Sequence, residues 1–252
     1  MSVLRYPGGK TRAVQQLLPF IPETCKTMYS PFFGGGSFEL SSGLEVYGND
    51  LFQPLIVFWK CASSKNSELV KVIRKLKEDI TKEKLIEYQR QLREETTPDL
   101  MTAAYYFAIN RSSFSGATFS GGFSEEAIQK RFTESSIVRL ENLDLVRCTF
   151  TCLDYATFLK TVPENESSFI YADPPYYLGK KSTLYGNKGD LHIDFDHVSL
   201  YHEITSKKCP WLISYNDCDF IRDLYSKFTI QTLSWSYGMS KDKTSKEILI
   251  YR

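Results

Sequence analysis

Short apolar runs, bounded by polar residues, glycine or proline, recur along this chain and predict buried β-strands. Two of them lie near the start, and the others follow a long helical segment. We expect strands at 27–30, 45–49, 149–152, 168–172, 210–215, 229–235 and 247–251. The last two are joined by a lysine-rich segment that predicts a hairpin. Strands that alternate with helices in this way are typical of an α/β fold.

Helical periodicity interrupts the strand pattern between the second and third runs. Residues 69–77 and 85–92 space apolar side chains for one helix face among mixed charges, and 101–109 is more apolar. No glycine- or proline-rich linker separates this region cleanly. We therefore expect 53–147 to be an insertion packed on a sheet domain made of 1–52 and 148–252. Further helices are expected at 11–18, 154–159, 196–207 and 219–228.

The segment from Asn110 to Ser124 has neither periodicity. It contains few strong helix formers and many small hydroxylated residues, glycines and aromatic residues. This composition predicts an exposed loop or β-hairpin that meets a partner. A disordered connector is the alternative, but Phe114, Phe119 and Phe123 argue against it, because an unstructured loop gains nothing from aromatic rings.

Composition narrows the class of protein without naming an activity. The 252 residues carry a net charge of +1, and 42% of them are hydrophobic, which is ordinary for a globular protein. Near-neutral charge does not exclude nucleic-acid binding, which needs only a local positive surface. The chain starts in polar sequence, and no apolar run approaches the length of a membrane span. We expect an intracellular protein, cytoplasmic if it is prokaryotic or viral, with no membrane partner.

Cysteine and histidine spacing disfavours several chemistries. The six cysteines are scattered without a Cys-x-x-Cys pair, so we expect free thiols and no metal site. His192, His197 and His202 are five residues apart, a spacing that suits neither one helix face nor a known metal pattern. No histidine lies near a plausible serine nucleophile, which makes a hydrolase triad improbable.

The strongest chemical signal is the tetrapeptide Asp173-Pro174-Pro175-Tyr176, directly after the predicted strand 168–172. The two prolines bring no N–H donor, so Asp173 and Pro174 can present oxygens. Such a corner suits a planar amine, whose hydrogens the oxygens accept while the tyrosine stacks on its face. The alternative is a surface turn with a packed tyrosine.

A glycine cluster supplies a second signal. Gly34, Gly35 and Gly36 follow the first predicted strand and precede an expected helix, and Asp50 ends the second strand. Strand, glycine turn, helix, strand and terminal acid form the nucleoside-binding half of a Rossmann-like fold. The sequence Gly-Gly-Lys-Thr at 8–11 is not a P-loop, because Leu4 stands where the motif needs glycine.

These motifs and their order resemble the Dam-type DNA adenine-N6 methyltransferases, which use S-adenosylmethionine. The resemblance rests on 5–10, 31–36, Asn49-Asp50, Asn110-Arg111, 173–176, Tyr215-Asn216 and 245–250. It implies a Rossmann-like methyltransferase sheet with a C-terminal β-hairpin. It also implies that 1–52 and 148–252 are the catalytic domain and that 53–147 is an inserted, mainly helical target-recognition domain, with a hairpin or loop near 110–124.

The resemblance also implies cofactor contacts. Tyr6 and Lys10 would contact the methionine end of S-adenosylmethionine, and Asp50 would hold the ribose. The other implied contacts are Phe32, Gly34 and Gly36 against the cofactor, Asp154 and Tyr155 beside its adenine, and Asp173 touching both cofactor and target base.

The chemistry explains why the family needs these residue types. The lone pair of an adenine amine is delocalised into the ring. The Asp173 carboxylate and the Pro174 carbonyl would accept the two amine hydrogens, aim the lone pair at the methyl group and stabilise the cationic nitrogen that forms. The product would be S-adenosyl-L-homocysteine. Because a base inside a duplex cannot be reached, the adenine must flip out, and Tyr176 would stack on it.

Double-stranded DNA is the implied partner, bound by a monomer or a weak dimer. The expected DNA contacts are Asn110, Arg111, Ser112, Phe119, Lys180, Lys181 and Tyr185. Ser115 and Thr118-Phe119-Ser120 replace the residues usual in members that modify GATC, so a GATC target is not favoured. Arg111, Gln129, Lys130 and Arg131 remain as candidates for base reading.

Other functions stay open. The same fold would serve RNA adenine or cytosine N4, and a catalytically silent DNA-binding relative would share the motifs. Membership of a restriction–modification system, a virus or a housekeeping pathway is equally open.

Overall fold

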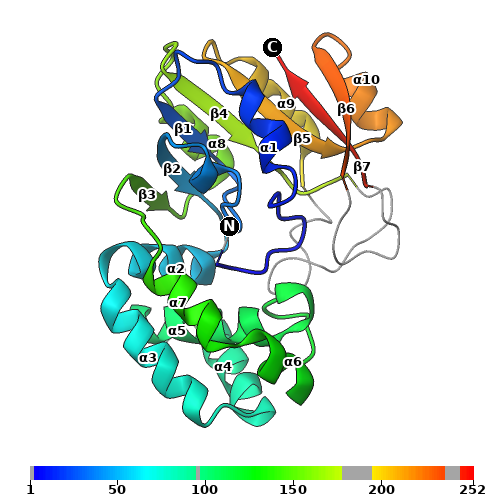
Figure 1. Cartoon of the computed structure of the whole chain (residues 1–252). Helices are drawn as coiled ribbons and strands as arrows, with labels where there is room; N and C mark the ends of the chain where they lie inside the picture. The colour runs from blue at the N-terminus through cyan, green and yellow to red at the C-terminus, as the bar shows by residue number, and fades with distance from the viewer. Residues whose placement is uncertain (1–2, 95–96, 178–194, 236–244) are drawn as a thin grey trace.

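A seven-stranded mixed sheet forms the upper half of the molecule in Figure 1. The computed structural model describes residues 3–94, 97–177, 195–235 and 245–252. The strands run in the order β3-β2-β1-β4-β5-β7-β6, the first five parallel and β7 antiparallel to both neighbours. Their bounds are β1 Thr27–Ser30, β2 Glu45–Asn49, β3 Cys148–Thr151, β4 Ser168–Ala172, β5 Trp211–Asn216, β6 Thr229–Trp235 and β7 Ser245–Tyr251. The α/β prediction is confirmed, as are the seven predicted strands.

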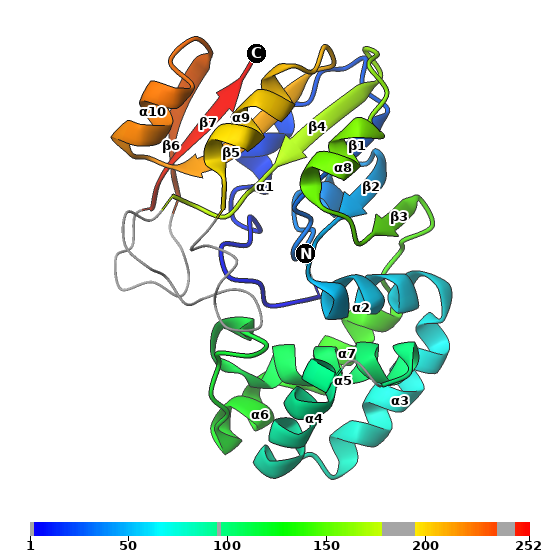
Figure 2. The ribbon, with the colours of Figure 1, turned by 180° about the vertical axis from the view of Figure 1, so that it is seen from behind.

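The central position of β4 in the sheet explains why its sequence is a continuous apolar run. All five residues are buried, because helices cover both faces of the sheet. Ile170 and Ala172 pack with α8 (Tyr155–Lys160) and α9 (His197–Thr205), which lie in front of the sheet in Figure 2. Phe169 and Tyr171 point the other way and pack with α1 (Val14–Leu17). Successive side chains alternate between the two cores, as strand geometry requires.

Helix ends follow local capping rules, and some helices are shorter than predicted. Asp196 caps α9 by accepting the N–H groups of Val198 and Ser199, as expected. Asp154 caps α8 in the same way. The helix expected after the glycine cluster is only a 3₁₀ turn, η2 (Glu39–Ser41). Two other predicted helices are short: α1 gives way to a second 3₁₀ turn, η1 (Leu18–Phe20), and α10 spans only Asp219–Leu224.

Below the sheet in Figure 1, the segment between β2 and β3 is mainly helical. Its elements are α2 Gln53–Ser64, α3 Asn66–Glu78, α4 Lys82–Glu94, α5 Asp99–Ser112, η3 Phe114–Gly116, α6 Glu125–Arg131 and α7 Glu134–Glu141. Helix α5 contacts α2, α3 and α4 and is buried over most of its surface, which explains its apolar sequence. Among the described residues, no helix has the length and apolarity to cross a membrane.

The helical segment and the sheet share one hydrophobic core. Trp59 of α2 stacks on Phe150 of β3, with ring centroids 5.8 Å apart, and meets Phe33 edge-on at 5.3 Å. Val46 of β2 belongs to the same cluster. Packing on the sheet is therefore as expected, whereas the proposed boundaries after 52 and 147 stay a prediction, because the core crosses both.

The predicted loop starts later than expected. Helix α5 continues to Ser112, so Asn110 is a helical residue. The side chains of Asn110 and Ser112 are fully buried. The sequence from Ser113 onward does form the expected turn, which an isolated antiparallel bridge between Ser113 and Phe123 closes. Sequence propensity placed the boundary too early because burial against the N-terminal segment, rather than intrinsic preference, extends the helix.

Asn110 joins this turn to the N-terminal segment. Its side-chain oxygen accepts the Arg5 N–H at 2.9 Å, and its amide donates to the carbonyls of Arg5 at 2.8 Å and Gly116 at 3.1 Å. Gly116 has a φ of +77°, and a Cβ there would stand 1.8 Å from the Arg5 carbonyl oxygen. Only glycine permits this close approach.

We predict that Asn110→Ala lowers the free energy of unfolding by about 2–4 kcal/mol, because it removes the three hydrogen bonds by which this buried side chain holds the Arg5 and Gly116 backbones together. Urea denaturation measures the change. Asn142→Ala is the matched control: its amide bonds only the Val138 carbonyl at the surface, so a change within about 0.5 kcal/mol is expected. Equal effects of the two substitutions would contradict the role given to Asn110.

Candidate active site

The carboxyl ends of β1, β2 and β4 bring the main sequence motifs together. From β1 the chain builds outward through β2 and β3, then returns to β1's other side with β4 and β5. Ligands of open α/β sheets bind where the strand order reverses in this way. The glycine turn follows β1, Asp50 follows β2, and Asp173 follows β4.

The glycine turn is shaped by two residues in the left-handed region. Gly34 has a φ of +50° and Gly36 a φ of +61°. A Cβ on Gly34 would stand 2.7 Å from the Tyr6 ring, and one on Gly36 would stand 2.4 Å from the Phe33 ring. Tyr6 therefore lies directly on the turn, which brings one predicted cofactor residue against another.

Asp50 closes the same turn. Its carboxylate accepts the N–H of Gly34 at 3.0 Å and the N–H of Phe52 at 3.0 Å. Burial raises the pKa of Asp50 to about 6, against the opposing effect of these hydrogen bonds. The residue is only partly buried, and each oxygen retains a lone pair for a further donor.

Neighbouring Asn49 holds the loops around Asp50 in place. The side chain is fully buried at the end of β2. Its amide donates to the carbonyls of Pro31 and Leu153, and its oxygen accepts from Thr151 and Leu153. All four hydrogen-bonding positions are filled, so the chain is fixed where it leaves β1, β2 and β3.

Lys10 and Asp173 form a buried ion pair. The Lys10 ammonium donates to both carboxylate oxygens of Asp173, at 2.7 and 2.8 Å, to the Tyr176 hydroxyl at 2.9 Å and to the Gly8 carbonyl at 3.0 Å. The lysine is 4% exposed, and the Asp173 side chain is 21% exposed. Ser214 of β5 donates to Asp173 at 2.8 Å. One face of the carboxylate thus remains accessible.

Carboxylates keep Lys10 charged. Burial alone would lower the pKa of Lys10, but Asp173 and Glu247 outweigh that effect and raise it. Glu247 lies 3.7 Å from the ammonium and is fully buried. Glu39, also buried, acts on Lys10 from farther away and accepts a hydrogen bond from Ser30 at 2.9 Å.

Sequence reasoning assigned no role to Glu39 or Glu247. A charged residue in an apolar strand, as Glu247 is before Ile248-Leu249-Ile250, is a signal that was present but unused. Glu39 had no comparable signal, because the helix expected there would tolerate an exposed acid.

Three aromatic rings meet beside the ends of β1 and β3. Phe32 lies 5.6 Å from Tyr155 and 5.6 Å from Phe195, and the last two are 5.5 Å apart, measured between ring centroids. The structure brings the predicted residues Phe32 and Tyr155 together and adds Phe195. Phe195 was missed because it lies between two polar stretches, with no periodic pattern to mark it.

The predicted DNA contacts that the structure describes differ in how far they are exposed. Asn110 and Ser112 are buried, as described above, and their roles stay predictions. Phe119 is partly buried, 5.7 Å from the Phe52 ring and under the Arg93 guanidinium. Lys180, Lys181 and Tyr185 lie outside the described residues. Phe114, which sequence reasoning used only as an argument for order, is 67% exposed.

Arg111 belongs to a cluster of arginines. Its guanidinium donates to the Arg131 carbonyl at 2.9 and 3.0 Å, and Arg131 donates to the Ser113 carbonyl. Burial, and to a smaller extent the positive charges of Arg139, Arg5 and Arg131, lower the pKa of Arg111 to about 10. Like charges gathered at one place favour an anion there.

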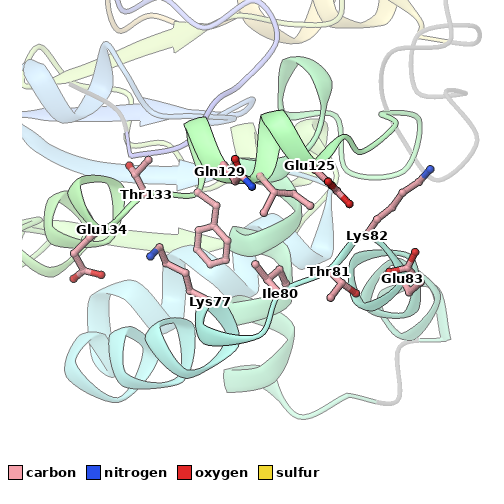
Figure 3. Close-up of a pocket in the computed structure, with 11 residues that line it drawn as sticks. Lys77, Ile80, Thr81, Lys82, Glu83, Glu125, Gln129, Thr133 and Glu134 are labelled. Carbon is pink, nitrogen blue, oxygen red and sulfur yellow. The ribbon is translucent and has the colours of Figure 1, made fainter.

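A groove in the helical segment lies away from the strand ends. Figure 3 shows Lys77, Ile80 and Lys82, around the α3–α4 connection, facing Gln129 of α6 across it. Gln129, considered for base reading, is the one sequence candidate that lines this groove. Among the described residues, no cluster of three or more histidine, cysteine or acidic side chains could hold a metal ion.

Comparison with known proteins gives one family. The model described as "D12 class N6 adenine-specific DNA methyltransferase" matches residues 6–239. The chain is 25% identical over 245 residues to the "DNA N-6-adenine-methyltransferase" of Escherichia phage P1, covering 92% of this chain but only 32% of that protein. It is 23% identical to "Type II methyltransferase M.CviBI" of Paramecium bursaria Chlorella virus NC1A, covering 90% of this chain and 86% of that protein.

The chain also aligns with a solved structure, that of magnesium protoporphyrin IX methyltransferase from Synechocystis PCC 6803 with bound SAM. The alignment covers 97% of this chain and 80% of the methyltransferase chain. The sequence identity is 11% and the TM-score 0.36, so this likeness carries no argument about the site.

The buried carboxylates predict a pH dependence of stability. Burial raises the pKa of Glu39 from 4.5 to about 7, so folding favours its protonated form. This contribution is complete below about pH 4.5 and is lost as the pH rises through about 7. We expect the free energy of unfolding to fall over that range. Glu39→Gln should flatten the fall, because a glutamine side chain does not titrate. Its oxygen can still accept the hydrogen bond from Ser30, so the local structure is kept.

Urea denaturation at several pH values between 4.5 and 7.5 measures this effect. Glu68→Gln, at an exposed position of α3, serves as the control and should leave the pH dependence unchanged. A Glu39→Gln protein whose stability falls as steeply as that of the unmodified chain would contradict the role of Glu39.

Proposed function

The chain belongs to the D12 class N6 adenine-specific DNA methyltransferase family, and we propose that it transfers a methyl group to the N6 amino group of adenine at specific sites in double-stranded DNA. The donor is S-adenosylmethionine. The observation that carries the proposal is the partly exposed carboxylate of Asp173 at the end of β4, held by Lys10 beside the glycine turn that follows β1.

The residues present fit the cofactor. Asp50 has lone pairs left for ribose hydroxyls, and the Gly34–Gly36 turn lets a ligand approach the backbone closely. Tyr6 and Lys10 would hold the methionine end. Phe32 and Tyr155, with Phe195, offer flat rings for an adenine ring. When bound, the cofactor supplies an electrophilic methyl group on sulfur.

Asp173 and Pro174 would prepare the amine for attack. The carboxylate and the Pro174 carbonyl accept the two amine hydrogens, which draws the nitrogen toward tetrahedral geometry and frees its lone pair. Both groups also stabilise the positive charge that develops on nitrogen. Because they are positioned before the substrate arrives, little reorganisation is needed during the reaction.

Pro175 and Tyr176 would complete the base pocket. The Tyr176 hydroxyl accepts a hydrogen bond from Lys10, and the Lys10 ammonium lies 5.2 Å from the centre of the tyrosine ring. These contacts hold the ring beside Asp173. Stacking of a flipped base on such a ring contributes roughly 1–3 kcal/mol. Pro175 keeps the tetrapeptide rigid through its fixed φ.

The helical segment 53–147 would recognise DNA. Its arginine cluster, formed by Arg111, Arg131 and Arg139 with Arg5, repels itself electrostatically, and a DNA phosphate would relieve that repulsion. The Asn110 side chain joins this segment to the N-terminal segment that leads to Lys10. The parts that would recognise DNA and carry out the reaction are therefore joined through the N-terminal segment.

We predict that Asp173→Asn reduces methyl transfer by at least about 10³-fold, because the amide cannot supply the negative charge that stabilises the cationic nitrogen. Transfer of tritium-labelled methyl groups from S-adenosylmethionine to mixed-sequence duplex DNA measures the rate, and mass spectrometry identifies N6-methyladenine. Asp219→Asn, at an exposed position of α10, is the control. Transfer by Asp173→Asn within tenfold of the unmodified rate would refute the assigned role.

We predict that Arg139→Gln weakens DNA binding about equally for all sequences, because a phosphate contact carries no sequence information. The slope of log affinity against log salt should become shallower by about 0.9 for one lost contact. Fluorescence anisotropy at several salt concentrations measures it. Arg74→Gln is the matched control, since Glu134 and Glu141 already neutralise that arginine. An unchanged slope in Arg139→Gln would exclude Arg139 as a phosphate contact.

A further inference from the structure

Glu247 is a buried acid that strand packing does not explain. It lies in β7, paired with Asn216 of β5 and Leu233 of β6. The next residues, Ile248 and Leu249, belong to the hydrophobic core, and Glu247 is as fully buried as they are, at 0% exposure. A carboxylate in such a place is costly unless a cation compensates it.

The compensating cation is Lys10, but the pairing is incomplete. The ammonium lies 3.7 Å from one Glu247 oxygen. Neither oxygen of Glu247 has a hydrogen bond from the residues that the structure describes. The three ammonium hydrogens are directed instead at Gly8, Asp173 and Tyr176. Glu247 can therefore accept further hydrogen bonds, although the Lys10 ammonium and the Tyr176 hydroxyl already lie close enough to oppose the rise of its pKa.

This arrangement bears on how an amine can reach Asp173. Lys10 covers both carboxylate oxygens, at 2.7 and 2.8 Å, and Ser214 adds a bond to one of them. An incoming amino group needs an oxygen that still accepts strongly. A lysine bound only to Asp173 would neutralise that carboxylate and weaken it as an acceptor. Glu247, a second carboxylate near the Lys10 ammonium, attracts the same positive charge and so reduces how fully Lys10 neutralises Asp173.

We propose, on the basis of the proposed function, that Glu247 is a positioning residue for methyl transfer: it takes over the Lys10 ammonium when the adenine amino group takes up Asp173. The shift from Asp173 to Glu247 requires no bond to be made or broken covalently, and no proton leaves the lysine. Glu247 itself touches neither the base nor the methyl group.

The groups around Glu247 set the pH range in which this works. Burial raises the pKa of Glu247 to about 7, Lys10 opposes the rise, and Asp173 adds to it. Tyr176 and Tyr171 also face the carboxylate, and burial keeps the pKa of both phenols far above the working range. Below about pH 7, a protonated Glu247 would leave the ammonium on Asp173.

Glu247→Gln tests the proposal, because it keeps the side-chain shape and removes the charge. We expect kcat for methyl transfer to fall about tenfold or more while the KM for S-adenosylmethionine and the Kd for DNA stay within about twofold. The unmodified protein should lose kcat below about pH 7, and the variant should lack this acid limb. Urea denaturation of both proteins checks that the variant is folded.

A second readout needs no turnover. NMR of protein labelled with ¹⁵N-lysine should show a lower pKa for Lys10 in Glu247→Gln, since one of its two neighbouring carboxylates is gone. Glu39→Gln is the matched control: it removes another buried carboxylate that acts on Lys10 from farther away, and it should keep the acid limb.

The outcomes separate the two proposals. An active unmodified protein, with a Glu247→Gln variant of equal kcat and equal acid limb, would overturn the role of Glu247 alone. An unmodified protein that transfers no methyl group to DNA would overturn the proposed function and this inference with it. A variant in which kcat falls while the KM for S-adenosylmethionine and the Kd for DNA both rise, with the Lys10 pKa unchanged, would show a structural role and refute the positioning role.

Discussion

The ion pair between Lys10 and Asp173 is the interaction on which the site depends. It joins residues 163 positions apart, and it is buried, so it is stable only if the surrounding groups complete its hydrogen bonds. The Gly8 carbonyl, Ser214 and Tyr176 do so, and each comes from a different part of the chain. The N-terminal segment, the tetrapeptide and β5 must all be in place before the Asp173 carboxylate has its geometry.

Buried contacts also join the sheet to the helical segment. The N-terminal segment that carries Lys10 is bonded to α5 through Asn110, and the Trp59 ring packs between β3 and the helices. The helical segment is therefore connected through Asn110 to the N-terminal segment that carries Lys10. The division of the chain at 52 and 147 stays a prediction, because the hydrophobic core crosses both positions.

Most elements could be predicted because their signals are local. The apolar runs became strands, and Asp196 capped its helix. The proximity of the glycine turn and Asp50 was also predictable, since Gly34 and Asp50 follow adjacent strands and meet in a hydrogen bond, whereas their role in cofactor binding stays a prediction. Failures occurred where tertiary contacts overruled local preference. Asn110 looked like a loop residue and is a buried helical one, because its amide serves the backbone of a distant segment.

The sequence by itself determined the class of the fold and the family, and it singled out the tetrapeptide 173–176, since these depend on patterns and spacings within short stretches. Only the tertiary structure decided which charges share a site. Glu247 follows no motif spacing relative to Lys10, yet they lie 3.7 Å apart. The physical reason is that burial and electrostatic coupling depend on distance in space, and strand order, which brings β7 beside β5, sets that distance.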